Sequence, residues 1–201
     1  MRRTHARIVT VLALLTLCAL PAHAERFAVR AAHLVDSRAG ALRGPVWVVV
    51  SGDTVESVLT SAPAGLEVKD LGNATLLPGL IDTHTHLANR VGVAPMARMK
   101  DPSARSAIAG VNNARATILA GFTTCRDVGG RERVDVALRD AIEAGEIVGP
   151  RMQVATWPLS MTGGHGDVTN GVDYHWCLDL ADGVSDGTDE VRKQVRLNIQ
   201  Q

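Results

Sequence analysis

The sequence predicts an α/β fold in two parts, a short-stranded β section over residues 25–78 and a section of βα units over residues 79–201. The first section holds short β-branched runs that alternate with turn residues. In the second section, apolar runs typical of buried strands alternate with helical patterns that end at glycine. Strands that alternate with helices indicate parallel strands joined by helical crossovers.

Residues 1–24 have the pattern of a secretory signal peptide. Three arginines and no acidic residue precede a 13-residue apolar run, residues 8–20, and an Ala-His-Ala sequence ends at Ala24. A membrane anchor needs about 20 apolar residues, and the bulky Leu17 before Cys18 argues against a lipoprotein. We therefore expect cleavage after Ala24, a periplasmic or secreted protein, and no membrane attachment after cleavage.

The charge of the chain excludes one class of partner. The chain has 21 basic and 21 acidic residues, and loss of the signal peptide leaves 18 basic residues against 21 acidic ones. No basic stripe indicates nucleic-acid binding. Cys125 and Cys177 remain after cleavage. An oxidising compartment permits a disulfide between them, and two separate thiols fit the sequence equally well.

The β section is expected to contain four strands, because turn residues such as Gly40 and Gly52 separate its β-branched runs. Their expected ranges are 27–35, 46–50, 54–59 and 67–71.

The second section is expected to run strand, helix, strand, helix, strand, long loop and helix, with helix stops at Gly121 and Gly145. The expected strands cover 80–82, 122–127 and 151–156, and the expected helices cover 103–120, 134–144 and 188–201. The long loop is rich in Gly and Asp. It contains four residues of types that often bind metals, but their spacing fits no ion-binding loop, so we expect them to be solvated: Asp167, Asp173, His175 and Asp179.

The main chemical signal is the pair His84 and His86, at the end of an apolar strand that follows Pro78-Gly79. Side chains two apart on a strand share a face, and two neutral imidazoles can hold one divalent ion. Asp82 lies behind them on that face and is expected to orient a ligand or to accept its second N–H. A lone His-x-His pair is more often structural, but this position at a strand end favours a metal site.

Four ordered motifs resemble the amidohydrolase superfamily, and within it the imidazolonepropionase-like branch that includes prolidase-type and Xaa-Arg/Lys dipeptidases. The motifs are Leu77–His86, Gly121–Gly130, Ala137–Arg151 and Thr162–Asp167. Cys125 stands where this branch commonly has Val, a small apolar change that a buried strand tolerates. The resemblance covers nearly all of the chain after the signal peptide.

The resemblance implies a (β/α)8 TIM barrel, of which this chain holds the N-terminal part, and a small β-sandwich built from both chain ends. It implies two divalent ions, usually zinc, bridged by a carboxylated lysine. By that pattern only His84 and His86 have counterparts here, and Lys193 is not a match. The lysine, two later histidines and the aspartate that acts as general base are expected beyond Gln201, so we expect a truncated chain.

The implied activity is hydrolysis of amide or peptide C–N bonds by metal-activated water, with dipeptides or related small molecules as substrates. His165, in a Gly-rich loop after the third strand, is a candidate substrate-binding residue for an α-carboxylate, and the alternative is a loop histidine bonded to its own backbone. Arg126 and Asp127 end the second strand, where a salt bridge or strand-end hydrogen bonds are favoured over substrate contact.

Three alternatives stay open. The parent enzyme could be a mononuclear cyclic-amide hydrolase like imidazolonepropionase, and this chain alone could be an inactive fragment that binds one ion weakly. A catalytic zinc typically has three protein ligands, so we expect no measurable peptidase activity from the fragment. A periplasmic binding module is disfavoured by the histidine pair. The sequence leaves a homo-oligomer open.

Overall fold

The computed structural model of the chain describes residues 25–98, 100–170 and 183–200. The expected signal peptide and the loop residues Asp173, His175, Cys177 and Asp179 lie outside these ranges. The chain divides into two compact units, Met1–Pro78 and Gly79–Gln201. None of the helices in the described ranges is both long and apolar enough to cross a membrane.

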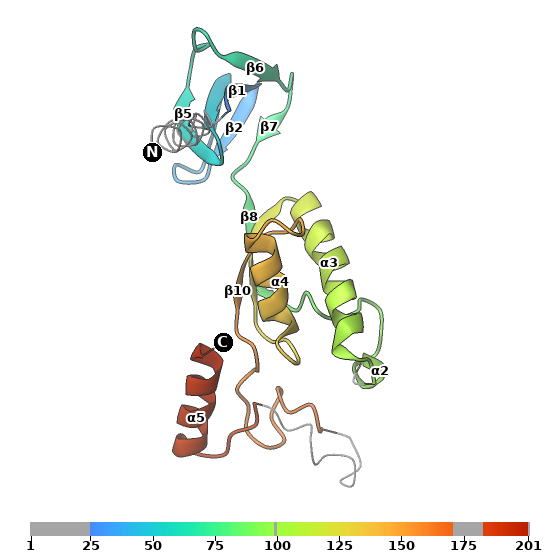
Figure 1. Cartoon of the computed structure of the whole chain (residues 1–201). Coiled ribbons are helices and arrows are strands. Elements are labelled where there is room, and N and C mark those ends of the chain that lie inside the picture. The colour runs from blue at the N-terminus through green and yellow to red at the C-terminus, as the bar shows by residue number, and fades with distance from the viewer. Residues whose placement is uncertain (1–24, 99, 171–182, 201) are drawn as a thin grey trace, which may run out of the picture. The chain divides into compact units, whose positions relative to one another are not determined.

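The first unit consists of two small sheets (Figure 1). Its strands are β1 (Arg26–Ala31), β2 (His33–Asp36), β3 (Ala41–Arg43), β4 (Val46–Ser51), β5 (Thr54–Leu59), β6 (Glu67–Asp70) and β7 (Thr75–Leu76). One sheet has the order β5-β4-β1-β6 and the other has the order β3-β2-β7. In the first sheet β1 runs antiparallel to β4 and parallel to β6.

The prediction of a single strand over residues 27–35 is wrong, because this segment forms two strands, β1 and β2. The chain bends at Ala32, so β1 and β2 join different sheets. Gly44 approaches this bend so closely that a β-carbon on it would lie 1.9 Å from the carbonyl oxygen of Ala32. Residues 27–35 contain no Gly or Pro, so the sequence gives no local sign of this bend.

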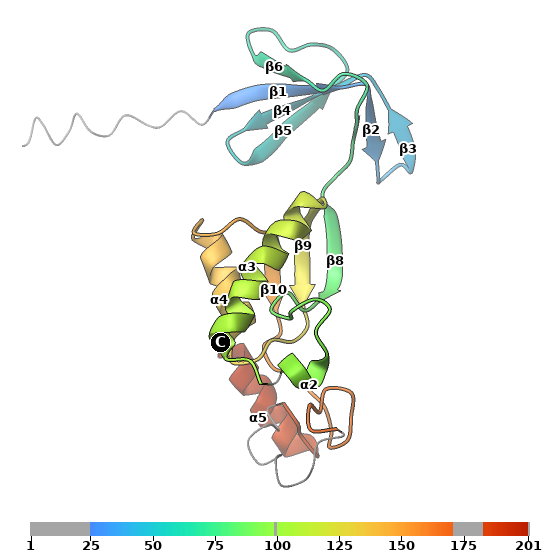
Figure 2. The same ribbon diagram turned by 90° about the vertical axis from the view of Figure 1, so that its right-hand side faces the viewer.

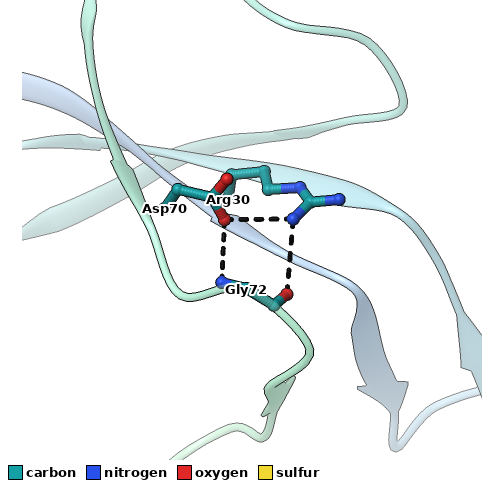
Figure 3. A network of polar contacts seen from close by, with 3 residues as sticks. All are labelled: Arg30, Asp70 and Gly72. Atoms are coloured by element: carbon teal, nitrogen blue, oxygen red, sulfur yellow. Dashed lines mark hydrogen bonds and ion pairs between the residues drawn. The ribbon is translucent and has the colours of Figure 1, made fainter.

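A polar contact closes the turn after β6 (Figure 3). Asp70 accepts hydrogen bonds from the guanidinium of Arg30 on β1, at 3.0 Å, and from the backbone N–H of Gly72, at 2.8 Å. The same guanidinium donates to the carbonyl of Gly72 at 3.4 Å. The turn is thereby tied to the neighbouring parallel strand.

The second unit is a three-stranded parallel sheet with helices on one face, as Figure 2 shows. Its elements are β8 (Leu80–Thr85), α2 (Pro95–Arg98), α3 (Ser103–Leu119), β9 (Phe122–Asp127), α4 (Val134–Glu143), β10 (Arg151–Val154) and α5 (Thr188–Ile199). The strand order is β10-β9-β8, with all pairings parallel. Right-handed crossovers place α3 and α4 on the same side of such a sheet.

The core of the second unit lies between its sheet and the two crossover helices. Ala114 of α3 and Leu138 of α4 pack with Cys125 of β9 and Met152 of β10, all at most 6% exposed. The thiol of Cys125 is free. The helices end where the sequence predicts, because Gly121 and Gly145 adopt positive φ angles of 93° and 73° that favour glycine after a helix.

The structure also differs from the expected elements at a few places. The strand expected over residues 151–156 ends at Val154, because Thr156 has a φ of +61°, which no strand residue can adopt. The short elements α2, β3 and β7 were not expected, since two to four residues carry no measurable period.

Candidate metal centre

His84 and His86 lie side by side at the C-terminal end of β8. His84 is within the strand and His86 follows its last residue. The centroids of the two rings are 5.5 Å apart and their planes meet at 75°, an edge-to-face arrangement. Both side chains are exposed. The pairing expected from the two-residue spacing is therefore present.

The ring of His86 is held through its Nδ1 atom. This nitrogen lies 2.9 Å from the carbonyl oxygen of Gly129, in the loop after β9. A carbonyl oxygen only accepts hydrogen bonds, so Nδ1 carries the proton in this contact. In a neutral ring, Nε2 is then the unprotonated nitrogen and can bind a metal ion.

Asp82 makes a different contact from the expected one. In the described chain, its Oδ1 atom accepts the backbone N–H of His84 at 3.0 Å, and no ring N–H reaches it. A short Asp side chain readily accepts the N–H two residues further along its own chain. Asp82 therefore orients the backbone of His84 rather than its imidazole.

Asp127 is a buried anchor for the loops that carry this site. Its two carboxylate oxygens accept the backbone N–H of Leu87 at 2.6 Å and that of Gly129 at 3.3 Å. The strand-end hydrogen bonds expected for Asp127 are thus present. Burial is the largest effect on the pKa of this carboxyl and raises it to about 6, against these hydrogen bonds, which lower it.

The histidine pair opens into a cavity of about 520 Å³ in the second unit. His165 lines this cavity together with both rings, so the structure brings together the three histidines singled out in the sequence. The remaining lining residues are Arg126, Val128, Ala155, Trp157, Pro158, Leu159, Gly166 and Asn198. No described acidic side chain lines the cavity, so its charged and titratable groups are all basic.

Arg126 and Asn198 also line the cavity, and no pattern in the sequence indicated this. The salt bridge expected for Arg126 is not among the ion pairs of the described residues, and its exposed side chain lines the cavity instead. Asn198 of α5 donates to the carbonyl of Trp157 at 2.9 Å, which ties the last helix to the apolar wall. Such long-range contacts leave no signal in local sequence patterns.

The two rings fit one part of a divalent metal site. Imidazole nitrogen is a common zinc ligand, and two strand-end rings with one Nε2 free match that chemistry. Within the described ranges, no group of three or more His, Cys, Asp or Glu side chains is arranged to hold an ion. The described residues therefore supply two ligands and not a complete set.

Comparisons with known proteins identify the family of the chain. The model of the amidohydrolase family matches residues 75–201. No curated protein matches the sequence. A crystal structure of a Xaa-Pro dipeptidase with methionine in its active site has 31% identity and a TM-score of 0.77, covering 87% of this chain and 44% of its own. A prolidase complexed with N-methylphosphonate-L-proline has 29% identity and a TM-score of 0.74, with coverage of 87% and 44%.

The fold extends to more distant proteins. Ochratoxinase from A. niger has 23% identity and a TM-score of 0.74, and the match covers 89% of this chain and 45% of that one. The chain spans less than half the length of each of these three structures. Its parallel βα units correspond to the predicted fold class, an α/β chain that holds the N-terminal part of a TIM barrel and a small β domain. On the family match and the similarity to the dipeptidase, the chain belongs to the amidohydrolase family.

Proposed function

We propose that the protein is a metal-dependent hydrolase of amide or peptide C–N bonds, dipeptidase-like in substrate, with His84 and His86 as two of its metal ligands. The observation that carries this proposal is the orientation of His86. Its Nδ1 is bound to the carbonyl of Gly129, which leaves Nε2 as the nitrogen available for an ion beside the ring of His84. The similarity to a Xaa-Pro dipeptidase and a prolidase supports the substrate class.

When bound, zinc or another divalent ion supplies a water of lowered pKa and polarises the scissile carbonyl. The residues of this chain hold and surround that centre. His165 lines the same cavity, and its proposed role is to bind the carboxylate of a dipeptide or an N-acyl amino acid. Trp157 and Pro158 form an apolar wall that excludes water from the bound substrate. No described residue is assigned as general base.

A zinc-dependent peptidase assay tests this proposal. The purified chain and its His84→Ala variant are assayed on Xaa-Pro, Xaa-Arg and Xaa-Lys dipeptides, with zinc and with a chelator, beside a version extended past Gln201 with later barrel strands. We expect zinc-dependent hydrolysis by the extended protein, lost in the variant, and almost none by the 201-residue chain, whose described residues supply two ligands where three are typical. Activity of the extended protein that persists in chelator and in His84→Ala would contradict the proposal.

The cyclic-amide alternative is tested by adding a cyclic amide as a further substrate in this assay. A mononuclear enzyme like imidazolonepropionase would hydrolyse a cyclic amide in preference to the dipeptides. The similarity to structures of a Xaa-Pro dipeptidase and a prolidase favours the dipeptides.

We also propose export to the periplasm or outside the cell, from the basic and apolar pattern of residues 1–24. N-terminal sequencing of the exported protein should begin at Glu25, and recovery of an intact Met1 in that protein would contradict export by cleavage.

A further inference from the structure

We propose that Asp135 is a positioning residue for the ring of His86, acting through Thr156 and the peptide that joins Gly129 to Gly130. Asp135 lies in the first turn of α4 and Thr156 follows β10, so neither belongs to the strand of His86. The proposal deepens the proposed function, because it concerns the residue that orients one of the metal ligands.

The first link is a single peptide group that is held on both sides. The carbonyl of Gly129 accepts the Nδ1–H of His86 at 2.9 Å, and the N–H of Gly130 donates to the carbonyl of Thr156 at 2.8 Å. These two groups belong to one peptide plane and point in opposite directions. A rotation of this plane that breaks the bond to Thr156 also turns the carbonyl away from His86.

The second link holds Thr156 in an unfavourable conformation. Its φ is +61°, in the left-handed region that β-branched residues avoid. Asp135 Oδ2 accepts the N–H of Thr156 at 2.9 Å, while the carbonyl of the same residue accepts from Gly130. The backbone of Thr156 is thus fixed from both ends, and Asp135 supplies one of the two bonds that hold it against strain.

Asp135 and Thr156 are both buried, so their contact is shielded from solvent. Asp135 is 0% exposed and Thr156 is 2% exposed. Asp135 Oδ1 and Thr156 Oγ1 are buried without a hydrogen-bond partner in the part of the chain that the structure describes. Unsatisfied buried groups are rare because they destabilise the fold. The hydrogen bond from the N–H of Thr156 to Asp135 Oδ2 is therefore a contact between two buried residues, and it is the contact on which the positioning role rests.

Two glycines allow this close packing. A β-carbon on Gly130 would lie 2.7 Å from the carboxylate of Asp135, so a side chain there would displace it. A β-carbon on Gly129 would lie 3.3 Å from Pro158 and 3.5 Å from the ring of His86. The ring and the apolar wall therefore meet at this loop, and the conformation of Thr156, which precedes the wall, affects both.

The tautomer of His86 is the direct test, read by ¹⁵N NMR of the histidine side chains in the metal-free 201-residue chain at pH 8. We expect Nδ1–H for His86 in the wild type. Asp135→Ala should give a mixture of tautomers and about tenfold weaker zinc binding. Asp135→Asn should keep the wild-type tautomer, because its amide oxygen can still accept the N–H of Thr156. Asp140→Ala, which removes an exposed carboxylate from the same helix, is the matched control and should change neither.

A double variant separates positioning from general stability. Glycine adopts a positive φ without strain, so Thr156→Gly in the Asp135→Ala background should restore the Nδ1–H tautomer and the zinc affinity. A wild-type tautomer and zinc affinity within twofold of wild type in Asp135→Ala would overturn the proposal. If Asp135→Ala does not fold, the double variant decides. A double variant that folds but lacks the Nδ1–H tautomer of His86 overturns the proposal, and so does one that also fails to fold.

The tautomer is measured without metal, so this result is independent of the proposed function. A wild-type chain that binds no zinc through His84 and His86 would refute the metal site and leave the tautomer result standing. A His86 tautomer that is the same in the wild type and in Asp135→Ala would refute the positioning role and would not affect the proposed metal site.

Discussion

Asp127 is fully buried at the end of β9, yet it is ionised at neutral pH, because its pKa is raised only to about 6. Its carboxylate receives the N–H of Leu87, the residue after His86, and the N–H of Gly129, whose carbonyl holds the His86 ring. One side chain thus fixes the backbone on both sides of the ring. This geometry makes Asp127 a structural support for the candidate metal site rather than a residue that contacts substrate.

The raised pKa of Asp127 predicts a defined pH dependence of stability. Between its unfolded value near 3.8 and its folded value of about 6, the folded state binds the proton more tightly. The contribution of Asp127 to stability is therefore fully present below about pH 4 and is lost as pH rises through about 6. The loss amounts to up to about 3 kcal/mol, from about 1.4 kcal/mol per pKa unit.

Urea unfolding of the metal-free protein from pH 4 to pH 7 measures this effect. The Asp127→Asn variant has no titrating group at this position. The stability of the wild type relative to the variant should therefore decrease as pH rises across this range. A difference that stays constant with pH would contradict the raised pKa.

The residues of the site were predictable to different degrees. The two-residue spacing of His84 and His86 at a strand end predicts their shared face, and the Gly-rich loop predicts that His165 reaches the same rim. The partner of the His86 ring was not predictable, because a bond from a side chain to a distant backbone carbonyl depends on tertiary geometry and not on residue type. The hydrogen bond from the N–H of Thr156 to Asp135 was not predictable for the same reason.

At the scale of elements, α4 is the helix that the core holds most firmly. Val134, Val136 and Leu138 are at most 5% exposed, and Leu138 packs in the core cluster against the sheet. By contrast, α5 has no buried residue among its twelve. The positions of loops after β9 and β10 depend on α4, because Asp135 in its first turn binds Thr156.

Truncation of Leu138 tests this packing. Leu138→Ala removes a side chain that is 3% exposed, and we expect the free energy of unfolding to fall by roughly 2–5 kcal/mol from lost burial and the cavity left behind. Leu119→Ala, at a leucine that is 75% exposed at the end of α3, is the matched control and should change it by less than about 0.5 kcal/mol. Denaturant unfolding measures the free energy of unfolding of both variants. Equal losses in the two variants would contradict the assignment of Leu138 to the core.

The elements that the sequence predicted well have strong local signals. The strands β5 and β9 match their expected bounds, and α3 and α4 each end one residue before the expected limit, next to Gly121 and Gly145. The elements that the sequence analysis missed or merged have bounds that depend on contacts with residues outside those elements. The switch between sheets at Ala32 depends on Gly44, and the early end of β10 depends on the strained Thr156.

At the scale of the whole molecule, the second unit provides the site. It contains the three parallel strands, and the histidine pair and Arg126 line its cavity. The C-terminal ends of parallel strands are where sites form in α/β barrels. The family match, residues 75–201, covers this entire unit, Gly79–Gln201.

Zinc binding by the purified 201-residue chain tests the central claim most directly. Isothermal titration of the metal-free protein should show one zinc bound, with affinity reduced by at least tenfold in His84→Ala and in His86→Ala. His33→Ala, at an exposed histidine on β2 of the first unit, is the matched control and should bind zinc as the wild type does. Zinc affinity that is unchanged in both His84→Ala and His86→Ala would contradict the account.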